Sequence, residues 1–264
     1  MKENNYNDSL PPVIFVPGGV MPAALSYAPL LAVIKDEVRP VVKDLEIYAT
    51  DRPPINYGLE MEVDGIMRTA EEAGFDTFHL VGYSAGGASS LAFTARHPER
   101  LRSLALIEPA WIGNENLTQD DVRDFSELDR IVTLPPDERM QAFSRWQMRP
   151  GVEPPKLPLP PGPPPEWMKK RPAGLEAVSR AFKTYSLNRE RFRSFFQPVY
   201  YALGSLSRSF YERNGQVLAQ FFPNMSVEIY EGRSHYDPPH RAEPERFARA
   251  LRLLFSQQVG MNVS

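Results

Sequence analysis

The stretch Phe78–Gly87, which reads FHLVGYSAGG, decides the fold of this chain. An apolar run typical of a strand ends at Gly82, and a helical pattern of small residues begins at Ala85. The Gly82-x-Ser84-x-Gly86 motif between them predicts a sharp strand-to-helix turn that holds a serine hydroxyl above a sheet. Glycine on each side of the serine removes Cβ atoms that would clash with the neighbouring strand and helix. The motif alone is a weak signal, but its context predicts that Ser84 is a nucleophile.

Strand and helix patterns alternate on both sides of this stretch. Apolar runs predict further strands at Val13–Val16, Arg39–Leu45, Leu104–Ile107, Pro198–Gly204 and Val227–Tyr230. Amphipathic periodicity and helix-stop residues predict helices at 25–33, 57–73, 85–97, 206–221 and 247–255. Such alternation is typical of βαβ units and of a parallel sheet. The sequence therefore predicts an α/β protein with a mostly parallel sheet flanked by helices.

The alternation stops after Trp111. Residues 112–195 contain helical patterns but no convincing strand, and a proline tract at 150–165 indicates a stiff linker. The strand and helix pattern resumes after this block. We therefore predict that residues 1–111 and 196–264 form the core and that residues 112–195 form a helical, proline-rich cap or lid insertion.

Composition excludes several classes of function. The 264 residues carry 30 Lys and Arg against 33 Asp and Glu, a net charge of −3 that predicts no binding of nucleic acid. Cysteine is absent, so disulfides, cysteine-bound metals and a cysteine nucleophile are excluded. No metal-ligand spacing or phosphate-binding glycine motif occurs, so we expect no metal and no cofactor. No apolar run approaches the ~18 residues of a membrane span.

The polar N-terminus does not resemble a signal peptide, and a cytoplasmic location is expected. The expected partner is a small-molecule substrate. Both a monomer and a homo-oligomer remain open.

A serine nucleophile needs a base, and the chain has four histidines. His79 lies inside a predicted strand, and His97 ends a predicted helix. His235 follows the last predicted strand, at the carboxyl edge of the sheet where Ser84 also emerges. We therefore predict that His235 is the base, with His240 as the alternative.

These motifs together resemble the α/β-hydrolase superfamily. The matching segments are Leu80–Gly87, His97–Arg100, Leu104–Pro109, Glu231–His235 and Glu243–Phe247. The resemblance covers the chain apart from its N-terminal arm and residues 112–195, the interval in which this family inserts a cap domain. It implies the α/β-hydrolase fold with a serine nucleophile.

The resemblance puts the acid of the catalytic triad at an uncommon position. Most members carry an aspartate after the strand that corresponds to Val199–Leu203, but Gly204–Ser209 contains no carboxylate here. Some members place the acid after the strand that follows the nucleophile helix, which is Glu108 in this chain. A glutamate that closes an apolar strand is costly to bury unless it is hydrogen-bonded, and His235 would be its partner. The alternatives are Asp44, Asp237 and Glu231.

The resemblance also implies an oxyanion hole and a substrate pocket. One N–H donor would come from Ala85 and another from Gly19 or Val20, in a loop where the family usually has His-Gly. Aromatic residues of the insertion are expected to line a mostly apolar pocket. The candidate lining residues are Tyr83, Trp111, Phe143, Trp146, Trp167 and Phe182.

The implied activity is that of a serine hydrolase. It would cleave a carboxylic ester, lactone or thioester of a medium-sized apolar substrate through a Ser-His-Glu triad and an acyl-enzyme. Two alternatives stay open: a C–C bond hydrolase, lyase, cyclase or perhydrolase that uses the same site, and a ligand receptor without turnover. Haloalkane dehalogenases and epoxide hydrolases need aspartate at the nucleophile position, so Ser84 argues against both.

Overall fold

A parallel sheet is the centre of the molecule. Within residues 9–154, 163 and 165–257, which the computed structural model describes, six strands form one sheet in the order β2-β1-β3-β4-β5-β6. All neighbouring strands run parallel, as the sequence predicted. The strands are β1 (Pro12–Val16), β2 (Arg39–Val42), β3 (Phe78–Tyr83), β4 (Leu101–Ile107), β5 (Val199–Gly204) and β6 (Met225–Tyr230).

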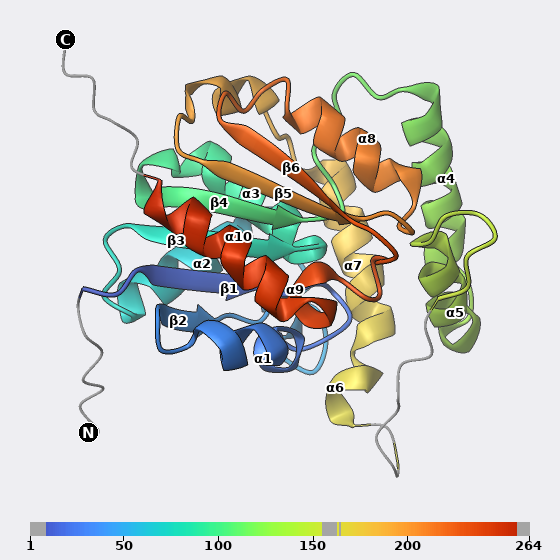
Figure 1. Ribbon diagram of the computed structural model, residues 1–264. Helices are drawn as coiled ribbons and strands as arrows, with labels where there is room; N and C mark the ends of the chain where they lie inside the picture. The colour runs from blue at the N-terminus through green and yellow to red at the C-terminus, as the bar shows by residue number, and fades with distance from the viewer. Residues whose placement is uncertain (1–8, 155–162, 164, 258–264) are drawn as a thin grey trace.

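Helices cover both faces of this sheet (Figure 1). One face carries α1 (Ala23–Ile34), α9 (Pro239–Ala242) and α10 (Pro244–Ser256). The other face carries α2 (Leu59–Glu72), α3 (Ala85–Arg96) and α8 (Ser209–Leu218). Two short 3-10 helices belong to the predicted core, η1 (Glu46–Tyr48) and η2 (Pro98–Arg100), and a third, η3 (Arg189–Ser194), ends the inserted segment.

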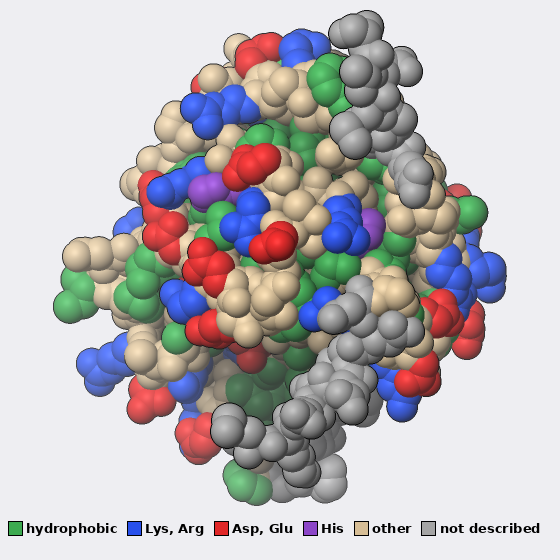
Figure 2. Space-filling model, turned by 90° about the vertical axis from the view of Figure 1, so that its left-hand side faces the viewer, with side chains coloured by type: hydrophobic (Ala, Val, Ile, Leu, Met, Phe, Trp, Pro, Cys, Tyr) green, Lys and Arg blue, Asp and Glu red, His purple; other side chains and the backbone are tan. Residues whose placement is uncertain are grey.

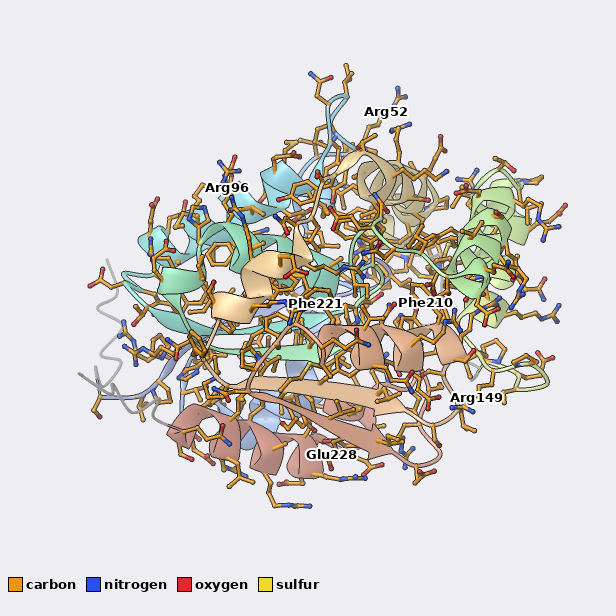
Figure 3. All side chains as sticks on the ribbon, turned by 90° about the horizontal axis from the view of Figure 1, so that it is seen from above. Arg52, Arg96, Arg149, Phe210, Phe221 and Glu228 are labelled. Carbon is orange, nitrogen blue, oxygen red and sulfur yellow. The ribbon has the colours of Figure 1, made fainter. Side chains whose placement is uncertain are left out.

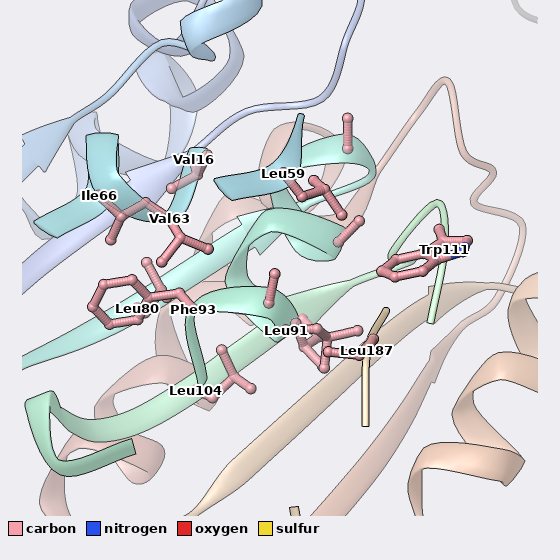
Figure 4. Packing of buried hydrophobic residues seen from close by; sticks show 14 of the residues in the cluster. Val16, Leu59, Val63, Ile66, Leu80, Leu91, Phe93, Leu104, Trp111 and Leu187 are labelled. Atoms are coloured by element: carbon pink, nitrogen blue, oxygen red, sulfur yellow. The ribbon is translucent and has the colours of Figure 1, made fainter. Parts of the chain in front are cut away.

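Strand β1 shows why its sequence is apolar throughout. Val13 and Phe15 pack into the hydrophobic cluster under α1 and α10. Ile14 and Val16 point to the opposite face, into the cluster under α2 and α3 (Figure 4). Successive side chains of a strand alternate between faces, so a strand covered on both sides must be apolar at every position.

The α-helices of the inserted segment, residues 112–195, lie beyond the carboxyl ends of the strands (Figure 1). Its helices are α4 (Gln119–Val132), α5 (Pro136–Trp146), α6 (Glu166–Lys169) and α7 (Arg171–Thr184). A capping box between Thr118 and Asp121 begins α4. The predicted proline-rich linker lies largely outside the described residues. The division into core and cap domains stays a prediction.

The inserted segment is joined to α8 by charged and aromatic contacts. The Arg208 guanidinium lies 2.7 Å from Asp124 and 2.5 Å from Glu127 on α4, and Arg213 also binds Asp124. Phe210 of α8 lies between the two parts, with its ring centroid 5.8 Å from that of Phe125 and 5.7 Å from that of Trp146 (Figure 3).

The surface carries mixed charge. Figure 2 shows acidic and basic side chains interspersed on the face away from the inserted segment. Among the residues that the structure describes, no helix combines the length and apolar character needed to span a bilayer.

Candidate active site

The turn between β3 and α3 holds Ser84 in a strained conformation. Its φ of 52° and ψ of −116° lie outside the backbone regions that residues other than glycine usually adopt. A Cβ at Gly82 would lie 2.3 Å from the Ser90 hydroxyl, and a Cβ at Gly86 would lie 2.4 Å from the Val16 carbonyl oxygen. The two glycines therefore let the turn pack between the nucleophile helix and the end of β1.

Ser84, His235 and Glu108 form a continuous chain of hydrogen bonds. Ser84 Oγ lies 3.0 Å from His235 Nε2, and His235 Nδ1 lies 2.7 Å from Glu108 Oε2. The three residues are 7%, 4% and 0% exposed, respectively. An ionised Glu108 only accepts hydrogen bonds, so it holds the proton on Nδ1 and leaves Nε2 free to accept the serine hydroxyl. The structure thus brings together the three residues that sequence reasoning selected.

Glu108 is supported by the loop that lacks the usual acid. Its Oε1 accepts a 2.7 Å hydrogen bond from the Gly204 N–H, and its own N–H donates to the Ala202 carbonyl at 3.2 Å. A Cβ at Gly204 would lie 2.3 Å from the Arg233 carbonyl oxygen, so glycine allows the end of β5 to approach the loop that carries His235. The buried carboxylate has partners for both oxygens, which offsets its desolvation.

Two tyrosines hold the imidazole of His235. The Tyr83 hydroxyl donates to the His235 carbonyl oxygen. The Tyr211 ring is stacked on the imidazole, with centroids 4.4 Å apart and an angle of 9° between the planes. The Tyr211 hydroxyl lies 3.4 Å from Nε2 and donates to Gln147 Oε1 of the inserted segment. Sequence reasoning missed Tyr211 and Gln147, because neither belongs to a motif.

The alternative base lies beneath the site. His240 is fully buried, and its Nε2 is 3.1 Å from the Ser26 hydroxyl, so it does not take the position beside Ser84. Burial, with smaller contributions from the Arg241 and His235 charges, lowers the pKa of His240 well below its usual value.

The carboxylates considered as alternative acids of the triad are bound to other groups or exposed. Asp44 accepts a 2.7 Å hydrogen bond from the Ala23 N–H, and Asp237 pairs with Arg233 at 2.9 Å. Glu231 is exposed. Of the carboxylates considered for the triad, Glu108 is the one that the described hydrogen bonds join to His235.

The glycine loop after β1 lies against the nucleophile turn. A Cβ at Gly18 would lie 3.1 Å from that of Ser84, and one at Gly19 would lie 3.9 Å from that of Ala85. The Tyr48 hydroxyl donates to the Gly19 carbonyl oxygen at 2.6 Å. Because a trans peptide is planar, this bond also fixes the direction of the Val20 N–H. Sequence reasoning missed Tyr48, which reaches the loop only through the tertiary fold.

A pocket opens above Ser84, between the core and the inserted segment. Its volume is ≈ 840 Å³ when the space at its open mouth is included. Most of its wall is apolar. Of the six aromatic residues predicted to line it, four do so: Tyr83, Phe143, Trp146 and Phe182.

The other two predicted pocket residues lie elsewhere. Trp111 is 1% exposed and stacks behind Phe182, with ring centroids 5.5 Å apart, so it supports the wall without forming its surface (Figure 4). Trp167 lies in a separate depression beside Tyr48, 5.3 Å from the Arg171 guanidinium. Helical periodicity does not specify which face of the inserted segment meets the pocket.

The described residues contain no group of three or more His, Asp or Glu side chains arranged to hold a metal ion.

A parallel α/β sheet with a serine on a strained turn after a central strand defines the class of proteins built around a nucleophile elbow. The family model described as alpha/beta hydrolase fold matches residues 11–238. The chain belongs to the α/β-hydrolase family, which confirms the resemblance seen in its sequence. No curated protein sequence matches the chain.

Solved structures share this fold at low sequence identity. Carboxylesterase CesB from Bacillus subtilis is 17% identical with a TM-score of 0.68, over 96% of this chain and 86% of that one. Naproxen esterase from Bacillus subtilis is 18% identical with a TM-score of 0.65, over 93% and 84%. The 2-hydroxy-6-oxo-6-phenylhexa-2,4-dienoate hydrolase from Rhodococcus is 17% identical with a TM-score of 0.63, over 94% and 91%.

Proposed function

We propose that the protein is a serine hydrolase that cleaves a carboxylic ester, lactone or thioester of a medium-sized, largely apolar substrate. The observation that carries this proposal is the buried chain of contacts from Ser84 Oγ through His235 to Glu108, at 3.0 and 2.7 Å. The esterases among the structural neighbours are consistent with it.

In the first half of the reaction, Ser84 Oγ attacks the carbonyl carbon while His235 Nε2 takes the hydroxyl proton. Glu108 keeps the imidazole in the correct tautomer and stabilises the imidazolium that forms. The flat Tyr211 ring, 4.4 Å away, favours the same cation through its π face. Nε2 then gives its proton to the leaving oxygen or sulfur, and the acyl group stays on Ser84.

The tetrahedral intermediate carries a negative oxygen that needs donors. We assign these to the Ala85 N–H, at the N-terminus of α3, and to the Gly19 or Val20 N–H of the glycine loop. Loss of one such donor typically costs about 3 kcal/mol of transition-state stabilisation. Water, activated by His235, then attacks the acyl-enzyme and releases the acid.

We further propose that residues 112–195 act as the cap of this enzyme. Their contribution to the pocket wall includes Leu128, Phe143 and Phe182, which are apolar side chains facing the nucleophile. Such a wall binds an apolar acyl or alcohol group and keeps water away from the reacting carbonyl.

A fluorophosphonate probe tests the proposal, because it reacts with a serine that its own active site has activated. We expect labelling of the wild-type protein, hydrolysis of para-nitrophenyl esters, and a loss of at least ~10³-fold in kcat/KM for Ser84→Ala. Ser256→Ala, on the exposed end of α10, is the matched control. An unlabelled wild-type protein would overturn the proposal. Labelling without turnover of esters, lactones or thioesters would show an activated serine but contradict the proposed hydrolase activity.

A further inference from the structure

The two sides of the pocket differ in chemistry. The wall from the inserted segment is largely apolar and includes Phe143, Trp146 and Val178. The wall from the core includes Ser26 and Arg241, on α1 and α9. Among the described residues that line the pocket, none is an aspartate or glutamate, and Arg241 is the one with a permanent charge. A bound molecule therefore meets a largely apolar pocket with one guanidinium, on the core side.

Arg241 differs from Arg233 and Arg246 in having no carboxylate partner among the residues that the structure describes. Arg233 pairs with Asp237 at 2.9 Å and with Glu243 at 2.8 Å. Arg246 pairs with Glu228 at 2.7 Å. Within the described part of the chain, no carboxylate lies within ion-pair distance of Arg241. Arg241 therefore lines the pocket without a carboxylate among the described residues to neutralise it, so its charge is available to a ligand.

The charge of Arg241 acts on groups at the base of the pocket. Burial raises the pKa of the Tyr83 phenol well above its usual range, and the Arg241 charge opposes that increase. Tyr83 directly precedes the nucleophile. The nearest carboxylate of the site, Glu108, is fully buried behind His235 and already hydrogen-bonded. Where water is partly excluded, a guanidinium attracts an anion more strongly than it does in bulk solvent.

We propose that Arg241 forms an anion subsite, so that the preferred substrates are esters or thioesters bearing a free carboxylate in addition to the bond that is cleaved. A single guanidinium matches a carboxylate because its parallel N–H groups bind both oxygens. This inference rests on the proposed hydrolase function and specifies its substrate class.

Matched pairs of esters test the subsite in the full-length protein. The para-nitrophenyl half-ester of adipic acid and its primary-amide counterpart have the same length and leaving group, and differ by one charge in the acyl part. The acetate esters of para-hydroxybenzoate and para-hydroxybenzamide differ by one charge in the alcohol part. The readout is the ratio of kcat/KM between the anionic and the neutral member of each pair, measured at low salt.

We expect the wild-type protein to prefer the anionic member of at least one pair by about ten- to a hundredfold, the range for a hydrogen bond between charged groups. Arg241→Gln should bring that ratio to about one. Arg241→Lys should keep an intermediate ratio, because lysine retains the positive charge but lacks the two parallel N–H groups of a guanidinium. Arg249→Gln, which removes the same charge from the exposed side of α10, should keep the wild-type ratio. A ratio near one in the wild type for both pairs, or a preference that survives Arg241→Gln, overturns the proposal.

A binding measurement separates this inference from the proposed reaction. Calorimetry of Ser84→Ala protein with hexanoate and with hexanamide needs no turnover. Tighter binding of hexanoate that is lost in the Ser84→Ala, Arg241→Gln double variant supports the subsite even if the wild-type protein neither labels with fluorophosphonate nor cleaves esters. Equal binding of the two ligands, in a protein that does cleave esters, overturns the subsite and leaves the hydrolase function in place.

Discussion

The two sides of the active site are held in different ways. On the core side, Ser84, Glu108 and His235 follow three different strands and are joined by hydrogen bonds among groups that are at most 7% exposed. On the side of the inserted segment, Phe143 and Trp146 contribute mainly apolar contact area. The core therefore fixes the positions of the proposed catalytic groups, and the inserted segment shapes the pocket above them.

Polar contacts join the two sides in addition to the hydrophobic clusters that run between them. Asp124 on α4 is bound by Arg208, which directly precedes α8, and by Arg213 of α8; the two arginine side chains are 18% and 23% exposed. Arg171 of α7 stacks on Tyr48, with its guanidinium carbon 3.7 Å from the ring centroid. Changes in the core should thus act on kcat, whereas changes in the inserted segment should act on stability and substrate binding.

The largest expected effect lies in the core, at Glu108. In Glu108→Gln the side-chain amide can donate to His235 Nδ1, which places the imidazole proton on Nε2 and prevents Nε2 from accepting the Ser84 proton. We expect kcat for ester hydrolysis to fall by about 10³- to 10⁴-fold, as in triads whose acid becomes an amide. Stopped-flow or steady-state assays with para-nitrophenyl esters measure this fall in kcat.

Asp237→Asn is the control for the assignment of the acid, since this residue pairs with Arg233 at 2.9 Å. Its activity should stay within a few-fold of wild type. A larger loss in Asp237→Asn than in Glu108→Gln would transfer the acid role to Asp237.

On the other side, Asp124→Asn tests the link between the inserted segment and α8. Asp124 is 4% exposed and binds two guanidinium groups, so its loss removes one partner from each, while Arg208 keeps Glu127 and Arg213 keeps Asp121. Removing one member of a buried ion pair costs about 3–5 kcal/mol, and the partial exposure of the arginines reduces our expectation to about 2–3 kcal/mol. Denaturant unfolding measures this loss, and KM should rise more than kcat falls.

Asp120→Asn supplies the comparison on the same helix. Asp120 pairs with Arg123, but the two side chains are 51% and 70% exposed. Surface pairs of this kind contribute less than about 1 kcal/mol. If the two variants lose equal stability, α4 is not held to the core by the Asp124 cluster.

The same contrast explains what the sequence could predict. The strands, the nucleophile turn and the positions of His235 and Glu108 follow from local patterns, because parallel strands bring their carboxyl ends to one edge whatever the surrounding side chains are. The roles of Tyr48 and Tyr211 depend on tertiary contacts between segments far apart in the chain, so no local pattern marks them. Aromatic composition predicted a pocket wall, but not that Trp111, the last residue before the inserted segment, lies behind it.

The smallest of the expected effects lies where the two sides meet, at Tyr48. Tyr48→Phe removes the 2.6 Å hydrogen bond to the Gly19 carbonyl while keeping the ring that stacks on Arg171. The Gly19–Val20 peptide plane then loses one of its anchors, and its N–H is less well aligned with the oxyanion. We expect kcat to fall by about tenfold, less than the 10²- to 10³-fold of a donor that is removed outright. KM should change by less than twofold.

The pattern of kinetic constants tells a positioning role from a structural one. Tyr48→Phe should slow fluorophosphonate labelling in proportion to kcat, since the probe also develops negative charge on an oxygen that the loop would bind. Tyr185→Phe, which removes a hydroxyl from the boundary between the inserted segment and the core, should leave both rates near wild type. A Tyr48→Phe protein with lowered stability but unchanged kcat would mean that the hydroxyl only holds the fold. A raised KM with unchanged kcat would mean that Tyr48 shapes the pocket and leaves the oxyanion loop in place.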